Sequence, residues 1–240
     1  MKNKLVVVGD SYCVNYVNQM NQGQFKDSNW KYIEPFPIWP EIVSNHLNLP
    51  LVNLSIQGLG NWAIYSIALD AIVSEKDIGK LIVVWSGSNR INYEDPDKKH
   101  WVSKNDERES GTHPKGNIRA YLRYVYSLQE ICKIKNVDVI MFQSICPIVR
   151  REKWNHPHFS KDYGIKVGMD LIESPYFTKI DESVFPNFPG DRVFGGKSIS
   201  MSNLLAKVGW KKCAINDEDR HPNEFGSEVI ADHVTKYLTT

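Results

Sequence analysis

Four short runs of apolar residues recur along the chain, and polar or turn-forming residues close each run. Short apolar runs of this kind are typical of strands buried on both faces of a parallel sheet. Gly9 and Asp10 close the first run, which is the shortest of the four. The pattern therefore predicts four buried strands, at residues 5–8, 51–55, 81–85 and 137–142.

Between these runs, apolar residues recur at the three- and four-residue spacing of an amphipathic helix. Helices are predicted over residues 39–47, 62–71 and 118–133, and a closing helix begins near Asn223. Strands that alternate with helices predict a parallel sheet with right-handed crossover connections. We therefore expect an α/β protein, and 240 residues suffice for a single domain with a sizeable core.

Three segments show no clear periodicity. Residues 12–29 are mostly polar and predict a loop over the face that carries the chemistry. Residues 92–116 are polar and rich in turn formers, which predicts an insertion with little core. Residues 150–210 are rich in Pro, Phe, Gly and His. Such a long stretch is usually functional or contains short elements, so we interpret it as a substrate-binding insertion or cap, or else as a packed irregular loop.

Charge and apolar patterning exclude several classes of function. The 29 basic and 28 acidic residues nearly balance, which argues against a nucleic-acid partner. No apolar stretch approaches the ~20 residues that span a bilayer, and no secretory signal is recognised. We therefore expect a cytoplasmic protein without a membrane span. The cysteines form no CxxC pair and are expected to be reduced thiols: Cys13, Cys132, Cys146 and Cys213.

Candidate catalytic residues stand where the predicted strands end. Ligands of open α/β sheets bind beyond the carboxyl ends of the strands, and Ser11 follows the first strand. A serine there can act as a nucleophile if a base reaches it, and His221 is the candidate base. The backbone N–H groups of Ser11 and Gly58, with the side-chain amide of Asn89, would hold an oxyanion. These residue types together predict ester hydrolysis through an acyl-enzyme.

Each of these residues also has a purely structural interpretation. Ser11 can cap the helix that follows it, and His221 can do the same on the surface. Asn89 is a common turn former. Gly58 and Gly60 can both serve only to make a tight turn. His156 and His158 lack a third ligand at a recognisable spacing, so no metal site is expected.

The order of these motifs resembles that of the SGNH/GDSL hydrolase superfamily. Its blocks correspond here to residues 9–11 (Gly-Asp-Ser), Gly58, residues 87–89 (Gly-Ser-Asn) and His221 preceded by an acid. Order and spacing match from end to end, so the resemblance covers nearly the whole chain. It implies a flavodoxin-like three-layer α/β/α sandwich with a central parallel sheet. It also implies esterase, lipase, thioesterase or carbohydrate-deacetylase activity without a metal or cofactor.

Two departures from the family pattern affect the candidate site. Arg90 stands where the third block usually ends in Asp, which keeps Asn89 but changes what supports it. The acid usually stands three residues before the histidine, a position that Glu218 occupies here, whereas Asp219 stands two before His221. We predict that Asp219 orients His221, with Glu218 as the alternative and a backbone carbonyl as the third possibility.

The predicted substrate is a carboxylic ester on a small molecule or a carbohydrate, with carbohydrate O-deacetylation as the first candidate. Two other classes of function remain open. One is a non-catalytic glycan-binding or structural module, which Arg90 and the displaced acid favour. The other is an acyltransferase that uses the same residues. Aromatic side chains of the long loops are a candidate platform for a sugar or acyl chain: Trp30, Tyr32, Trp101, Trp154, Phe159 and Phe188.

Overall fold

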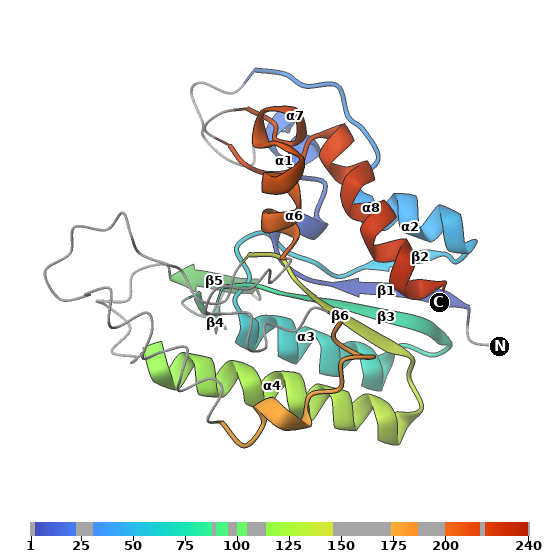
Figure 1. The fold of residues 1–240 in the computed structure, drawn as a ribbon, viewed down its shortest axis with the longest axis vertical. Coiled ribbons are helices and arrows are strands. Elements are labelled where there is room, and N and C mark those ends of the chain that lie inside the picture. The colour runs from blue at the N-terminus through green and yellow to red at the C-terminus, as the bar shows by residue number, and fades with distance from the viewer. Residues whose placement is uncertain are drawn as a thin grey trace, which may run out of the picture.

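A four-stranded parallel sheet forms the centre of the protein (Figure 1). The computed structural model describes residues 3–22, 31–87, 90–95, 100–104, 114–145, 174–186, 200–216 and 219–239. The strands of the sheet are β1 (Lys4–Val8), β2 (Leu51–Asn53), β3 (Ile78–Trp85) and β6 (Val139–Gln143), in the order β2-β1-β3-β6. All four predicted strands are therefore found, and their parallel pairing confirms the predicted α/β class.

Helices cover both faces of the sheet (Figure 1). On one face lie α3 (Asn61–Ser74) and α4 (Pro114–Lys135). On the other lie α2 (Trp39–Leu47), α6 (Met201–Val208) and α8 (Glu224–Leu238). This arrangement confirms the three-layer α/β/α sandwich, and the strand order follows the flavodoxin-like pattern.

The central strands are apolar on both sides because each side packs against a helical layer. Val6 and Val8 of β1 lie in the core beneath α3 and α4. Leu5 and Val7 lie in the core beneath α2 and α8. Successive strand residues point to opposite faces, so the continuous apolar run fills both cores. Complete burial of one such side chain contributes about 1.5–3 kcal/mol.

The prediction of a loop over residues 12–29 is wrong for the first part of that range, up to residue 21. A 3-10 turn, η1 (Ser11–Cys13), follows β1, and a short helix, α1 (Tyr16–Asn21), comes next. The Asn15 side chain caps α1 by accepting a hydrogen bond from the backbone N–H of Asn18. A helix of six residues is too short to show clear periodicity, so the sequence pattern did not reveal it.

The two expected insertions contain regular structure. Strands β4 (Ile91–Asp95) and β5 (His100–Lys104) form an antiparallel hairpin separate from the central sheet. The insertion expected at residues 150–210 contains the 3-10 helix η2 (Phe177–Lys179). After it, Phe185 packs into the core. The carbonyl of Val184 accepts a 2.7 Å hydrogen bond from the backbone N–H of Met141. Residues 174–186 therefore pack beside β6.

The remaining physical expectations concern membranes and thiols. Within the described ranges, no helix has both the length and the apolar character that crossing a bilayer requires. Cys13, Cys132 and Cys213 are free and buried, as predicted. Burial raises the pKa of the Cys13 thiol, which keeps it protonated and unreactive. Cys146 lies outside the described residues.

His233 on α8 predicts acid sensitivity of the fold. Its Nε2 atom is buried without a hydrogen-bond partner in the described structure, and burial, then Lys236 and Lys207, lower its pKa. The unfolded chain binds a proton near pH 6.5 whereas the folded ring stays neutral, so stability is full above about pH 6.5 and falls as the pH drops below it. We expect His233→Leu to flatten the dependence of the unfolding free energy on pH between about pH 5 and 7. Urea unfolding at several pH values measures this, and an unchanged slope would contradict it.

Candidate active site

A buried carboxylate ties together the carboxyl ends of three central strands. Asp10, directly after β1, is fully buried. Its Oδ2 atom accepts hydrogen bonds from the hydroxyls of Ser86 (2.7 Å), after β3, and Ser144 (2.8 Å), after β6. Its Oδ1 atom accepts the backbone N–H of Tyr12 at 3.1 Å. Asp10 thus fixes the turn that carries Ser11 against its neighbours in the sheet.

Arg90, the departure in the third block, contacts the first block. Its Nη1 atom lies 3.1 Å from Asp10 Oδ2, and its side chain is 25 % exposed. The guanidinium therefore offsets a charge that the fold buries completely. The backbone N–H of Arg90 also donates to the carbonyl of Gly87. Asn89 itself lies outside the described residues.

Two buried amides hold the chain where β3 ends. Asn61, the first residue of α3, accepts the backbone N–H of Ser86 (2.8 Å) and donates to its carbonyl (3.1 Å). Gln143 donates to the carbonyls of Trp85 and Ser86, and its own Oε1 accepts the hydroxyl of Tyr121 at 2.8 Å. These paired bonds satisfy polar groups that would otherwise be costly to bury.

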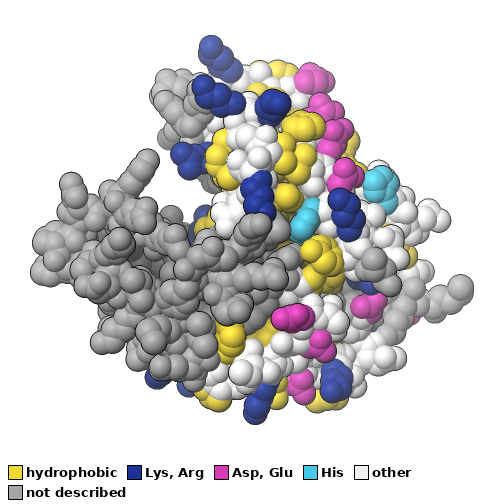
Figure 2. All heavy atoms as spheres, viewed as in Figure 1, with side chains coloured by type: hydrophobic (Ala, Val, Ile, Leu, Met, Phe, Trp, Pro, Cys, Tyr) yellow, Lys and Arg dark blue, Asp and Glu magenta, His cyan; other side chains and the backbone are white. Residues whose placement is uncertain are grey.

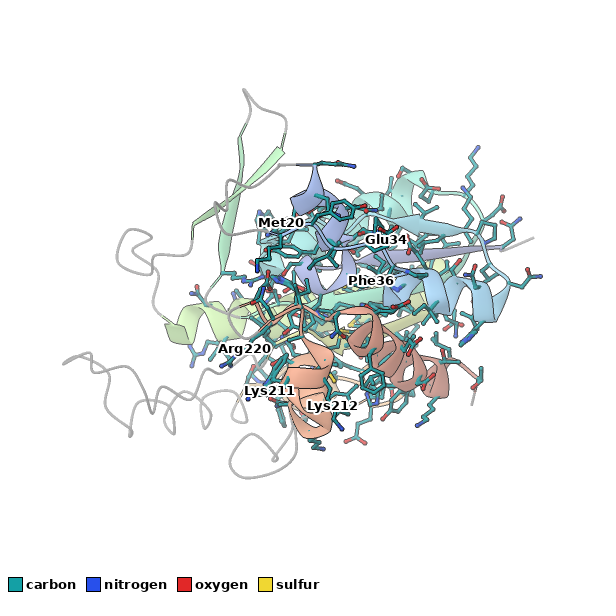
Figure 3. The ribbon with its side chains drawn as sticks, turned by 90° about the horizontal axis from the view of Figure 1, so that it is seen from above. Met20, Glu34, Phe36, Lys211, Lys212 and Arg220 are labelled. Atoms are coloured by element: carbon teal, nitrogen blue, oxygen red, sulfur yellow. The ribbon has the colours of Figure 1, made fainter. Side chains whose placement is uncertain are left out.

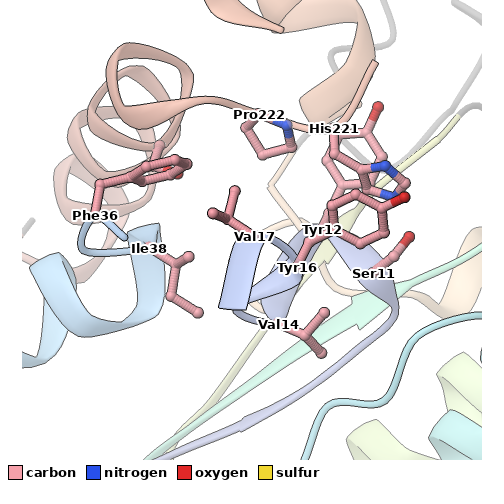
Figure 4. Close-up of a pocket in the computed structure, with 10 residues that line it drawn as sticks. Ser11, Tyr12, Val14, Tyr16, Val17, Phe36, Ile38, His221 and Pro222 are labelled. Carbon is pink, nitrogen blue, oxygen red and sulfur yellow. The ribbon is translucent and has the colours of Figure 1, made fainter. Parts of the chain in front are cut away.

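Ser11 and His221 line the same pocket (Figure 4). Ser11 begins η1 and is 4 % exposed. Figure 4 shows Ser11, Tyr12, Tyr16 and His221 grouped at one end and Phe36 at the other. The pocket has room for about one water molecule. The two ends of the sequence therefore meet at the nucleophile candidate.

The contact between Asp219 and His221 is direct. Asp219 Oδ1 lies 2.5 Å from His221 Nδ1, and it also accepts the backbone N–H of His221 at 3.0 Å. Burial alone would raise the pKa of the Asp219 carboxyl, but these hydrogen bonds and the charge on His221 hold it below its ordinary value. The carboxylate is therefore ionised at neutral pH, and it engages Nδ1 while Nε2 remains for another partner. Glu218 lies outside the described residues.

An aromatic ring covers one face of the imidazole. The rings of Tyr16 and His221 are stacked, with centroids 4.1 Å apart and an interplanar angle of 16°. Tyr12 lies farther away, at 5.9 Å and 46°. The contact between Tyr16 and His221 joins α1 to a loop from the far end of the sequence, so no spacing rule could have revealed it.

Gly58 lies in a turn whose backbone requires glycine. The chain after β2 continues beside β1, because Leu54 donates to the carbonyl of Val7 and Ile56 donates to that of Gly9. Gly58 then has φ of +78°, a left-handed conformation that favours glycine. Gly60 has φ of −96° and caps α3, so its conformation is open to other residues.

Polar groups that hold the site were missed in the sequence, although part of the signal was present. Ser86 directly follows a predicted strand, and Ser144 and Asp10 each follow a predicted strand after one intervening residue. Because carboxyl ends of parallel strands meet at one edge, their convergence could have been inferred.

The expected aromatic platform is largely untested, since among its members only the side chain of Tyr32, which is 70 % exposed, lies in the described part of the chain.

A different aromatic group lies on α3 and α4. Trp62, in the first turn of α3, is 47 % exposed. Its ring packs against those of Tyr65 (6.2 Å) and Tyr124 (5.7 Å). Trp62 follows Gly58, the candidate oxyanion residue, by four residues in the sequence.

Basic side chains lie on one side of the site. Arg220 precedes His221 and lies over the ring of Trp210, at 5.7 Å, in the short helix α7 (Trp210–Cys213). Figure 3 shows Arg220 near Lys211 and Lys212, and Figure 2 shows several Lys and Arg side chains around the end of the molecule that α6 and α7 form. The contact with Trp210 holds Arg220 to that side. The described residues contain no group of three or more side chains suited to a metal; His156 and His158 lie outside them.

Comparison with known proteins shows the fold. No protein-family model and no curated protein sequence matches the chain. Among solved structures, esterase EstA from Pseudoalteromonas sp. is 14% identical, with 99% of this chain and 100% of that chain covered and a TM-score of 0.51. A protein assigned to the lipolytic G-D-S-L family from Desulfitobacterium hafniense is 12% identical, with coverage of 98% and 99% and a TM-score of 0.51. LAE5, an alpha/beta hydrolase enzyme from the metagenome of Lake Arreo, is 12% identical, with coverage of 99% and 95% and the same TM-score. The chain thus has the fold of the SGNH/GDSL hydrolases, as its sequence blocks predict.

Proposed function

We propose that this protein is a serine esterase and that Ser11, His221 and Asp219 are its catalytic residues. The observation that carries the proposal is the bond between Asp219 and His221 Nδ1 in a pocket that also contains Ser11. The fold adds support, because an esterase and a hydrolase are among the similar structures. We also infer that residues 1–240 form one such domain.

In the proposed reaction, the Ser11 oxygen attacks the ester carbonyl carbon while His221 Nε2 takes the hydroxyl proton. The tetrahedral oxyanion accepts hydrogen bonds from the backbone N–H groups of Ser11 and Gly58 and from the Asn89 amide. One such donor is typically worth about 10²–10³ in rate. His221 then protonates the departing alcohol, which leaves an acyl group on Ser11. Water, deprotonated by His221, attacks this acyl-enzyme and releases the acid.

The proposed substrate is an O-acetyl or other acyl ester, and a carbohydrate is the first candidate for its alcohol part. The observation that favours a sugar is the half-exposed ring of Trp62, which packs against Tyr65 and Tyr124 and follows Gly58 by four residues in the sequence. A flat indole face can pack against the C–H face of a sugar ring. The same aromatic group would suit the alternative of a non-catalytic glycan-binding module, whereas an acyltransferase would differ only in the acceptor that enters the site.

A fluorophosphonate probe tests the nucleophile. We expect the wild-type protein to be labelled at Ser11, because the probe reacts with serine hydroxyls that a base activates. Ser11→Ala should abolish labelling and His221→Ala should strongly slow it, as read by mass spectrometry of the modified peptide. Ser74→Ala removes an exposed hydroxyl on α3 and should leave labelling unchanged. Labelling of another residue, or none in folded wild type, would favour the binding module.

A further inference from the structure

We propose that Tyr16 is a positioning residue for His221, an inference that rests on the proposed function. The Tyr16 ring lies parallel to the imidazole at 4.1 Å, close to the distance of ordinary ring contact (Figure 4). Nothing in the superfamily blocks includes this position, which follows the first block by five residues.

The imidazole needs a second anchor because its hydrogen bond to Asp219 comes from its own loop. Asp219 and His221 both lie in the segment that bridges back to Ala214 through Pro222. A shift of that segment would move acid and base together, away from Ser11. The bond to Asp219 therefore fixes the ring relative to its loop, and only contacts from outside that loop can fix it relative to Ser11. The hydroxyl of Tyr16 supplies one such contact through its hydrogen bond to the Asp219 side chain.

Tyr16 supplies that second anchor from the segment that carries Ser11. Several hydrogen bonds hold the stretch between them. The backbone N–H of Cys13 donates to the carbonyl of Asp10 and that of Tyr16 donates to Val14, while Trp39 Nε1 donates to the carbonyl of Tyr12 at 2.7 Å. The ring of Tyr16 thus has a fixed place relative to Ser11. By stacking on the imidazole, the Tyr16 ring fixes the position of His221 relative to Ser11.

The stack also suits the charge that His221 acquires when it takes the proton. An aromatic face is electron-rich and favours a cation placed over it. The groups that face the imidazole are the ionised Asp219 from its own loop and the rings of Tyr12 and Tyr16 from the Ser11 segment. Burial, followed by Asp10, raises the pKa of Tyr12, so its phenol stays neutral. Arg220 instead lies over Trp210. These contacts therefore suit the positive charge that His221 carries once it has taken the Ser11 proton.

Three variants test this role through the rate at which the fluorophosphonate probe labels Ser11. Tyr16→Ala should slow labelling by about tenfold, since a small displacement of a catalytic group has a large effect on rate. Tyr16→Phe keeps the stacked ring but removes the hydroxyl whose hydrogen bond helps lower the pKa of Asp219, so it should slow labelling less than Tyr16→Ala does. Met20→Ala, which truncates another buried side chain of α1, controls for loosening of the helix and should also stay close to wild type.

A coupled measurement separates positioning from general structural damage. If Tyr16 acts through His221, Tyr16→Ala should have much less effect in an Asp219→Asn background, where the imidazole is already misaligned. Equal slowing by Tyr16→Ala and Met20→Ala would overturn the inference.

A spectroscopic signature makes the inference independent of activity. The Nδ1 proton that His221 shares with Asp219 should give a downfield NMR signal, protected from exchange by the Tyr16 ring. Tyr16→Ala should broaden that signal, whereas Tyr16→Phe should retain it; an unchanged signal in Tyr16→Ala would overturn the inference. Absence of wild-type labelling together with the expected NMR behaviour would refute the esterase proposal while leaving the contact between Tyr16 and His221 supported.

Discussion

Asp219→Asn should lower kcat/KM for an activated ester by about 10⁴-fold, the effect known when the acid of a serine–histidine–acid triad becomes an amide. The physical reason lies at Nδ1. Asp219 Oδ1 lies 2.5 Å from that atom, so the carboxylate holds its proton on Nδ1 and keeps Nε2 available as the base. An amide at position 219 can donate instead, which favours the tautomer with its proton on Nε2.

Glu218→Gln is the matched test of the alternative acid, because it makes the same chemical change one residue earlier. We expect it to leave kcat/KM close to wild type. Asp70→Asn, on an exposed position of α3, controls for the loss of a surface charge. Steady-state hydrolysis of an activated ester measures all three, with circular dichroism to confirm folding. A greater loss in Glu218→Gln than in Asp219→Asn would show that the superfamily register of the acid is kept.

The layers of the fold were predictable because they depend on local patterns. Each central strand packs helices on both sides, so its apolar run shows in the sequence without any knowledge of its partners. The hairpin of β4 and β5 could not be found in this way, because its strands pair with each other apart from the central sheet. Residues 174–186 were also missed, since their place beside β6 depends on one backbone bond to Met141 and on packing of isolated residues such as Phe185.

The candidate site was predictable in its residues but not in its contacts. Ser11, Gly58 and His221 are recognisable because each stands at a strand or helix boundary. The choice between two adjacent acids could not be made from spacing, because it depends on how the loop before α8 turns. That loop brings Asp219 onto Nδ1 through a bond from its own backbone N–H to the side chain of Asn216. In the sequence, Arg90 indicates only that the usual Asp of the third block is missing. In the structure, its guanidinium contacts the carboxylate of Asp10.

Asp10→Ala should lower the free energy of unfolding by at least about 1–3 kcal/mol, the cost of one buried polar group that loses its partner. The variant would remove the acceptor of the Ser86 and Ser144 hydroxyls as well as the partner of Arg90. The Ser86 hydroxyl, left buried without that acceptor, carries the cost of its lost hydration, whereas the Ser144 hydroxyl keeps the carbonyl of Trp85 at 3.0 Å. Asp70→Ala, an exposed aspartate, should change the free energy of unfolding by less than about 0.5 kcal/mol. Urea unfolding followed by tryptophan fluorescence measures both.

A double-mutant cycle separates the ion pair from the hydroxyl contacts. Arg90→Met leaves the buried Asp10 carboxylate with its neutral donors, so we expect a smaller loss than in Asp10→Ala, because the arginine side chain is partly exposed. The double variant should lose less unfolding free energy than the sum of the losses in the two single variants. The second change removes a group that the first change has already left unpaired. Strict additivity would contradict a direct pair. Asp10 adjoins Ser11, so the folded Arg90→Met variant should also be labelled more slowly by the fluorophosphonate probe. Slower labelling would show that Arg90, which replaces the usual Asp of the third block, affects the reactivity of Ser11 in the first block.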